Sequence, residues 1–269
     1  MPWPTWQQAL LTALLASTCT LALSRLSPTP ARTAGRAAAT ELTVLAVLYA
    51  IWRMARQLPF ATTEGAVGRA RYVDRIERAL RMPSELSLQH FVLDHAWIGR
   101  FLNTYYAVMH VPALIAFLVW LFVRHRDVYP HWRNGLAITT GLCLVIHFVR
   151  VAPPRLVPGL GYIDTASVFG FDVYGPVGTG VSDQLAAMPS IHIAWAAVVS
   201  FGVVAASTSR WRWLALGHVI ITMIAVSATG NHWWLDGIVA IALLGLALWL
   251  DTAVRDRRGL GDAHRPLAS

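Results

Sequence analysis

Seven long apolar segments constrain the fold of this chain more than any other feature of its sequence. Each approaches the roughly 20 apolar residues that a helix needs to cross a bilayer. Only 13% of the residues are charged, against roughly a quarter in an average soluble domain. We therefore expect an all-α protein, a polytopic transmembrane helical bundle of about seven spans, near residues 7–24, 39–57, 101–123, 134–152, 187–207, 212–229 and 233–251.

The arginines predict how this bundle is oriented, because all 22 basic residues are arginine. Residues 1–252 are expected to form one transmembrane domain, followed by a disordered cytoplasmic tail over 253–269. The tail and alternate links between spans are basic, so the positive-inside rule places them in the cytoplasm and the N-terminus outside. The basic links carry Arg25, Arg32 and Arg36, then Arg124, Arg126 and Arg133, then Arg210 and Arg212.

One link, residues 58–98, is basic on the side that the rule assigns to the outside. Within it, Val73, Ile76 and Leu80 recur at helical spacing among arginines. This pattern predicts an amphipathic helix that lies in the membrane interface. A small solvated helix packed on the bundle fits the same pattern.

Polar groups at the ends of three predicted spans are candidates for function, because ionisable side chains at membrane depth are costly. The first group is in "HFVRVAPPRLVPGLGY", residues 147–162, where Arg150 and Arg155 flank two prolines. The prolines stop the helix, and guanidinium groups match phosphate oxygens. Arginines that simply reach for lipid headgroups would look the same.

The second group is in "LAAMPSIHIAWAA", residues 185–197. If Pro189 occupies an early helical position, the N–H groups around Ser190 and Ile191 point toward a bound anion. His192 would then lie about one turn away, within reach as an acid or base. A histidine hydrogen-bonded within the bundle is the alternative interpretation.

The third group is in "SATGNHWWLDG", residues 227–237, where His232 and Asp236 are four residues apart. On a helix they would project from one face, and the carboxylate would orient the imidazole as a nucleophile. Gly230 and Asn231 suit a tight turn whose amides face an anion.

Together the three groups predict a metal-independent phosphoryl-transfer site. Arg150 and Arg155 would neutralise phosphate, His232 with Asp236 would attack it, and His192 would protonate the leaving group. Two other hypotheses remain. His192, His232 and Asp236 form a set adequate to bind a metal, and a transporter would also carry polar residues within its spans.

The order of these motifs resembles that of the type two phosphatidic acid phosphatase superfamily. "APPR" and "TGNHWWLD" are most similar to its branch of inositol phosphorylceramide synthases and related bacterial membrane proteins, over roughly residues 100–250. The chain departs from the family pattern at two places. It has no lysine for the first motif, and the third motif has Ala225-Val226 where the family has Ser-Arg.

The resemblance implies a lipid phosphate phosphatase that acts near one face of the membrane without metal or other cofactor. Combined with the placement of the arginines, it leads us to expect a site on the outer face of a bacterial plasma membrane. His232 would form a phosphohistidine with support from Asp236, and His192 would protonate the leaving oxygen. Transfer from a lipid to an alcohol such as inositol is the alternative reaction. The expected partners are a lipid phosphate and the membrane, and no nucleic acid. The other site residues would be Arg150, Arg155, Ser190 and Asn231 at the phosphate, with Tyr106 and His110 of "NTYYAVMH" in the pocket.

Overall fold

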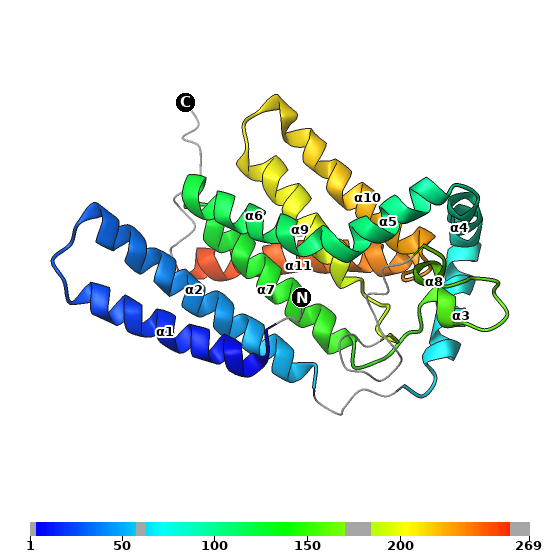
Figure 1. The fold of residues 1–269 in the computed structure, drawn as a ribbon, viewed down its shortest axis with the longest axis horizontal. Helices are drawn as coiled ribbons and strands as arrows, with labels where there is room; N and C mark the ends of the chain where they lie inside the picture. The colour runs from blue at the N-terminus through cyan, green and yellow to red at the C-terminus, as the bar shows by residue number, and fades with distance from the viewer. Residues whose placement is uncertain (1–3, 58–62, 170–183, 259–269) are drawn as a thin grey trace. The chain divides into compact units, whose positions relative to one another are not determined.

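The computed structural model describes residues 4–57, 63–169 and 184–258. Within these ranges all regular elements are helices (Figure 1). The described residues also contain one isolated β-bridge, between Val151 and Ala186. The all-α prediction is therefore confirmed. By its internal contacts the chain divides into two compact units, Met1–Phe60 and Ala61–Ser269.

The first unit is a hairpin of two apolar helices, α1 (Trp6–Ser24) and α2 (Pro30–Ala55). Thr5 caps α1 by accepting the N–H of Gln8, and Thr29 caps α2 in the same way. The buried positions are alanines, which allow two helices to approach closely, whereas five of the six leucines of α1 are exposed and Leu23 is half-buried. Such a surface suits lipid rather than water. The buried alanines are Ala9, Ala13 and Ala16 in α1, and Ala46 and Ala50 in α2.

The second unit is a bundle organised around α9 (Ile191–Ala206), which packs against α6, α7, α10 and α11. Small residues dominate its buried positions. Gly202 lies against the ring of Phe117 so closely that a Cβ atom there would clash with it. The other elements are α3 (Ala66–Ala79), α4 (Glu85–Asp94), α5 (Ala96–Val108), α6 (His110–Arg124), α7 (Tyr129–Ile146), η1 (Pro154–Leu156), α8 (Thr165–Phe169), η2 (Arg210–Ala215), α10 (Leu216–Ala228) and α11 (Trp234–Arg257).

Four helical segments are long and apolar enough to cross a membrane, and a bent pair of helices would make a fifth. The protein is thus an integral membrane protein with four to five candidate spans in the described residues. The helix α9 is apolar but has only 16 residues, or about 24 Å at 1.5 Å per residue. The four segments are Trp6–Ser24, Pro30–Ala55, Arg210–Ala228 and Trp234–Arg257.

The bent pair replaces the continuous span predicted over 101–123. The helices α5 and α6 meet at Met109 with an angle of 51°. Pro112 explains the break, since it has no N–H to donate to the carbonyl four residues earlier. The break places Tyr106 and His110, both 4% exposed, in the interior of the bundle.

Two further boundaries differ from the sequence prediction. The amphipathic helix forms as α3, but it buries Ala66, Ala70, Val73 and Glu77, while Leu80 caps its end and is 63% exposed. The helix α11 continues to Arg257, so the predicted tail begins inside it. Residues 259–269 lie outside the described part of the chain.

Candidate active site

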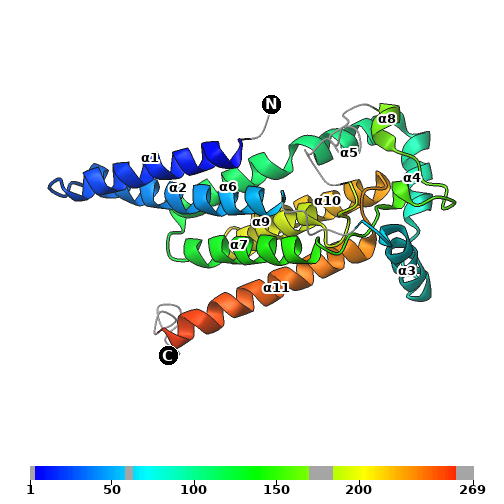
Figure 2. The same ribbon diagram turned by 90° about the horizontal axis from the view of Figure 1, so that it is seen from below.

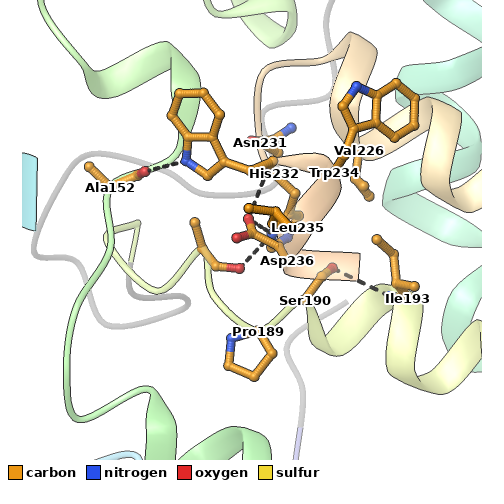
Figure 3. Close-up of polar contacts among 12 residues, drawn as sticks. Ala152, Pro189, Ser190, Ile193, Val226, Asn231, His232, Trp234, Leu235 and Asp236 are labelled. Carbon is orange, nitrogen blue, oxygen red and sulfur yellow. Dashed lines mark hydrogen bonds and ion pairs between the residues drawn. The ribbon is translucent and has the colours of Figure 1, made fainter. Parts of the chain in front are cut away.

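Hydrogen bonds join the three predicted motif segments near the place where α7 and α10 end and α9 and α11 begin (Figure 2), and Figure 3 shows the one that Ala152 accepts. The N–H of Ala187 donates to the carbonyl of Val151 at 3.0 Å, and the N–H of Arg155 donates to that of Gly230 at 3.0 Å. The indole N–H of Trp233 donates to the carbonyl of Ala152 at 3.0 Å. Segments far apart in the sequence therefore form one continuous site.

His232 is held through one nitrogen of its ring. Its Nδ1 lies 2.7 Å from the carbonyl oxygen of Ala187 and 3.2 Å from Oδ2 of Asp236. A carbonyl and a carboxylate both accept, so Nδ1 carries the hydrogen. In the neutral ring Nε2 then has the lone pair. The structure thus prepares Nε2 of His232, a residue 4% exposed, to act as a nucleophile.

Asp236 reaches His232 from the first turn of α11, for a different reason than the sequence predicted. The two residues do not share a helical face, because α11 begins only at Trp234. Instead Oδ2 of Asp236 turns back across the start of the helix and accepts the N–H of Trp233 at 2.8 Å, as a carboxylate at the third helical position does. The same oxygen faces Nδ1 of His232.

Pro189 and Ser190 precede α9, which corrects the prediction that Pro189 lies in its first turn. Ser190 is the N-cap, and its Oγ accepts the N–H of Ile193 at 3.4 Å. Its own N–H donates to the carbonyl of Asp236 at 3.1 Å and is not available to an anion. The hydroxyl hydrogen remains a possible donor, and the N–H groups of Ile191 and His192 belong to the first turn.

The turn at Gly230 and Asn231 forms as predicted, but its amides do not face an anion. Gly230 has a φ of 66°, and its N–H donates to the carbonyl of Ser227. The N–H groups of Asn231 and His232 both donate to Val226. This pattern closes the end of α10. The side-chain amide of Asn231 donates to Oγ1 of Thr229 at 2.8 Å.

The two arginines occupy different positions in the site. The side chain of Arg155 is 2% exposed and its Nε lies 3.6 Å from Oδ2 of Asp164. Its backbone N–H donates to the carbonyl of Gly230. Arg155 therefore lies beside the turn that precedes His232. Arg150 is half-buried, and its carbonyl accepts from Nε of Arg69 at 2.6 Å. The role of its side chain stays a prediction.

His192 lies among three other rings. Its centroid is 4.7 Å from that of Tyr106, 5.0 Å from that of His110 and 5.6 Å from that of His232. These separations are those of packed rings, so the rings of His192 and His232 are in contact with each other. The row continues to His218, 6.1 Å from His110 and hydrogen-bonded to Tyr105 at 2.5 Å.

Three buried polar residues that lie behind the site, at the start of α11 and the end of α10, were missed from the sequence. Glu77 and Glu85 accept the first N–H groups of α11. Gln89 accepts the N–H of Ile163 at 2.9 Å and donates to the carbonyls of Ile163 and Ala228. Gln89 thus ties α4 to the end of α10. In the sequence these three residues look like ordinary polar positions of an amphipathic helix. Residues that face water show the same pattern, so the sequence does not distinguish the two.

Over the same described ranges, no three His, Cys, Asp or Glu side chains are grouped so as to hold a metal ion. The alternative set of His192, His232 and Asp236 does not form such a group, because Nδ1 of His232 and Oδ2 of Asp236 are turned toward each other.

At one end of an apolar helical bundle the chain gathers a buried His–Asp pair, a second histidine and a buried arginine, a set suited to the chemistry of phosphate esters. Sequence comparison agrees: a model of the PAP2 superfamily matches residues 71–250, more than half of the chain. The chain therefore belongs to the PAP2 superfamily. Comparison with curated proteins and with solved structures finds no match.

Proposed function

We propose that the protein is a lipid phosphate phosphatase that works through a phosphohistidine on His232. The observation that carries this proposal is the double contact of Nδ1 of His232 with Ala187 and Asp236. It fixes the ring and leaves Nε2 to react. Family membership supports an enzyme that acts on phosphate esters, and the apolar helices support a substrate that resides in the membrane.

The first step transfers the phosphoryl group to the enzyme. Nε2 of His232 attacks phosphorus, the bond to the lipid oxygen breaks, and His192 gives that oxygen a proton. Asp236 stabilises the charge that develops on the ring of His232. Arg155, Arg150, Ser190 and Asn231 would hold the phosphate oxygens, with Arg155 the best supported because its side chain is buried beside the turn.

The second step releases the phosphate. His192, now neutral, takes a proton from a water molecule, whose oxygen attacks phosphorus as the bond to Nε2 of His232 breaks. Inorganic phosphate leaves and both histidines return to their first state. No step requires a group outside the chain except the substrate and water.

The second candidate reaction is transfer to an alcohol such as inositol instead of water. The row of rings beyond His192 favours it. Within the described residues Nε2 of His110 is buried without a hydrogen-bond partner, and Tyr106 and His218 lie beside it. Buried polar groups usually have a partner, so this row could accept the hydroxyl groups of a second substrate.

Labelled lipid phosphates incubated with the purified protein test the proposal. We expect release of inorganic phosphate that survives EDTA, and a labelled protein that is stable in base and labile in acid. Both should disappear in His232→Ala. His131→Ala is the matched control, because Nδ1 of His131 lies 2.7 Å from Oδ2 of Asp251 in a second His–Asp pair outside the site. Added alcohols that form new phosphodiesters or phosphate esters would show transfer. No turnover of any lipid phosphate would refute the class.

We also propose about seven spans, with α7 and α9 crossing the membrane beside the four to five candidate spans. The site would face the outside of a bacterial plasma membrane and the C-terminus the cytoplasm, as the arginines predict. Single cysteines at the exposed positions Ser167 and Ser209, in a protein without Cys19 and Cys143, should react with an impermeant reagent from opposite sides of the membrane. The reverse labelling would contradict this orientation.

A further inference from the structure

Two buried carboxyl groups, from two different helices, contact the start of α11. The N–H of Leu235 donates to Oε1 of Glu77 at 2.7 Å, and the N–H of Trp234 donates to Oε1 of Glu85 at 3.2 Å. These amides belong to the first turn and have no partner within their own helix. Glu77 is 4% exposed and Glu85 is 5% exposed. Both therefore cap, from outside, the helix that carries Asp236.

The two carboxyl groups accept N–H groups of consecutive residues and so lie within hydrogen-bond reach of each other, while Oε2 of Glu77 is buried without a donor among the described residues. An ionised carboxylate only accepts hydrogen bonds, so a bond between two of them requires a proton on one. Burial raises the pKa of Glu77 to about 9, helped by the bond to Glu85 and by the negative charges of Glu85 and Asp236, while the N–H of Leu235 acts in the opposite direction. At neutral pH Glu77 therefore keeps its proton.

Few positive charges oppose that arrangement. Arg78, on α3, is paired with Asp74 at 3.0 Å and its side chain is 69% exposed. Tyr162 approaches from the segment before α8, and burial raises the pKa of its phenol, so it too is neutral. Asp236 on α11 adds a further negative charge. Loss of the shared proton would therefore place two carboxylates side by side, and the positive charge that acts on them, Arg78, is exposed and already paired with Asp74.

We infer that Glu77 and Glu85 share one proton, position His232 through the start of α11, and set the alkaline limit of activity when that proton is lost. The role in activity rests on the proposed function. When the proton leaves to solvent, repulsion between the carboxylates loosens their contacts with Trp234 and Leu235. Asp236 follows those residues directly in the chain, so it shifts away from Nδ1 of His232 and the nucleophile loses its orientation.

Substitution of Glu77 separates positioning from a merely structural role. Glu77→Gln imitates the protonated state permanently, since its oxygen can accept from Leu235 while its amide donates to Glu85. We expect it to keep kcat and KM at neutral pH and to lose the alkaline fall of kcat near pH 9 that the native protein shows. Glu77→Ala should lower kcat at every pH with little change in KM. Glu64→Gln, at an exposed position before α3, is the control and should change neither.

Two measurements test whether Glu77 and Glu85 share a proton, even if the protein turns over no lipid phosphate. Infrared spectra of the full-length protein should show a protonated carboxyl band that titrates near pH 9 and is absent in Glu77→Gln. Hydrogen exchange at Trp234 and Leu235 should accelerate above that pH in the native protein but not in Glu77→Gln. The inference is overturned if the band is missing at neutral pH, or if Glu77→Gln keeps the native alkaline fall. Failure of the proposed function would appear instead as an inactive protein with both spectroscopic signals intact.

Discussion

Oδ2 of Asp236 lies 3.2 Å from Nδ1 of His232 and 2.8 Å from the N–H of Trp233. One oxygen thus fixes both the start of α11 and the ring of the proposed nucleophile. Because Asp236 is fully buried, neither contact is shared with water. The start of α11 and the reactivity of His232 are therefore linked through a single carboxylate. A substitution of Asp236 should affect both if the new side chain accepts no hydrogen bond, and only the reactivity of His232 if it still accepts the N–H of Trp233.

Asp236→Asn should separate the two contacts. Its amide oxygen can still accept the N–H of Trp233, so the helix start should survive, but a neutral group stabilises a charged imidazole poorly. We expect kcat to fall on the order of 100-fold or more while thermal stability in detergent changes little. Activity and unfolding of the same preparation measure both. Undiminished kcat would show that the carboxylate does not act on His232.

His192→Ala should lower activity in a way that depends on the leaving group. Loss of a general acid typically lowers rates about 10²- to 10⁴-fold, but a substrate whose leaving oxygen needs no proton escapes part of that loss. We expect a large fall in kcat for lipid phosphates and a much smaller fall for an aryl phosphate with an acidic phenol. Phosphoenzyme formation from both substrates should be followed in a rapid-quench experiment. Equal losses for both would argue against the acid role.

Gly202→Ala should destabilise the bundle, because its new Cβ would meet the buried ring of Phe117. Overpacking of this kind typically costs about 1–3 kcal/mol. Gly245→Ala is the matched control on α11, where a Cβ would meet nothing within 4 Å. Thermal unfolding in detergent should show a lower midpoint for the first variant and an unchanged or slightly higher one for the second. A similar midpoint for both would mean that α6 and α9 can move apart freely.

Folding stability should fall as pH rises, through Glu77. Its pKa is about 9 in the folded protein against 4.5 for the free side chain, so between these values the folded state binds a proton that the unfolded state does not. By linkage, the free energy of unfolding then decreases with pH over that window. Comparison of the native protein with Glu77→Gln in chemical unfolding should show a difference that changes from pH 5 to pH 9. A difference that is constant with pH would contradict the raised pKa.

The parts of the site that the sequence predicted are those carried by side chains in short motifs. His192, His232 and Asp236 were selected because histidine and aspartate are costly near a membrane span, and the structure brings all three together. The contact of His232 with Asp236 was expected for the wrong reason. The spacing by four assumed that both residues lie on one helix, whereas α11 begins two residues after His232. Register at a helix start depends on capping, which a periodic pattern does not show.

Tertiary contacts explain what was missed. Glu77 and Glu85 are ordinary polar residues of amphipathic helices, and only the packing of α3 and α4 on α11 makes them caps. To predict the break at Met109 required knowing that Pro112 would lie in the first turn of a new helix rather than kink a continuous one, a choice that neighbouring helices decide. The amides of Gly230 and Asn231 were assigned to an anion, whereas the end of α10 uses them itself.

The shortest contact of the proposed nucleophile is to the carbonyl of Ala187, a partner that every amino acid possesses. No single substitution can delete it, and a scan that replaces side chains one at a time would report position 187 as tolerant to any residue small enough to fit. A main-chain ester or thioamide introduced at that peptide bond is the kind of change that would reveal its contribution. In this protein, genetic variation therefore leaves untouched one of the two groups that aim the reactive ring.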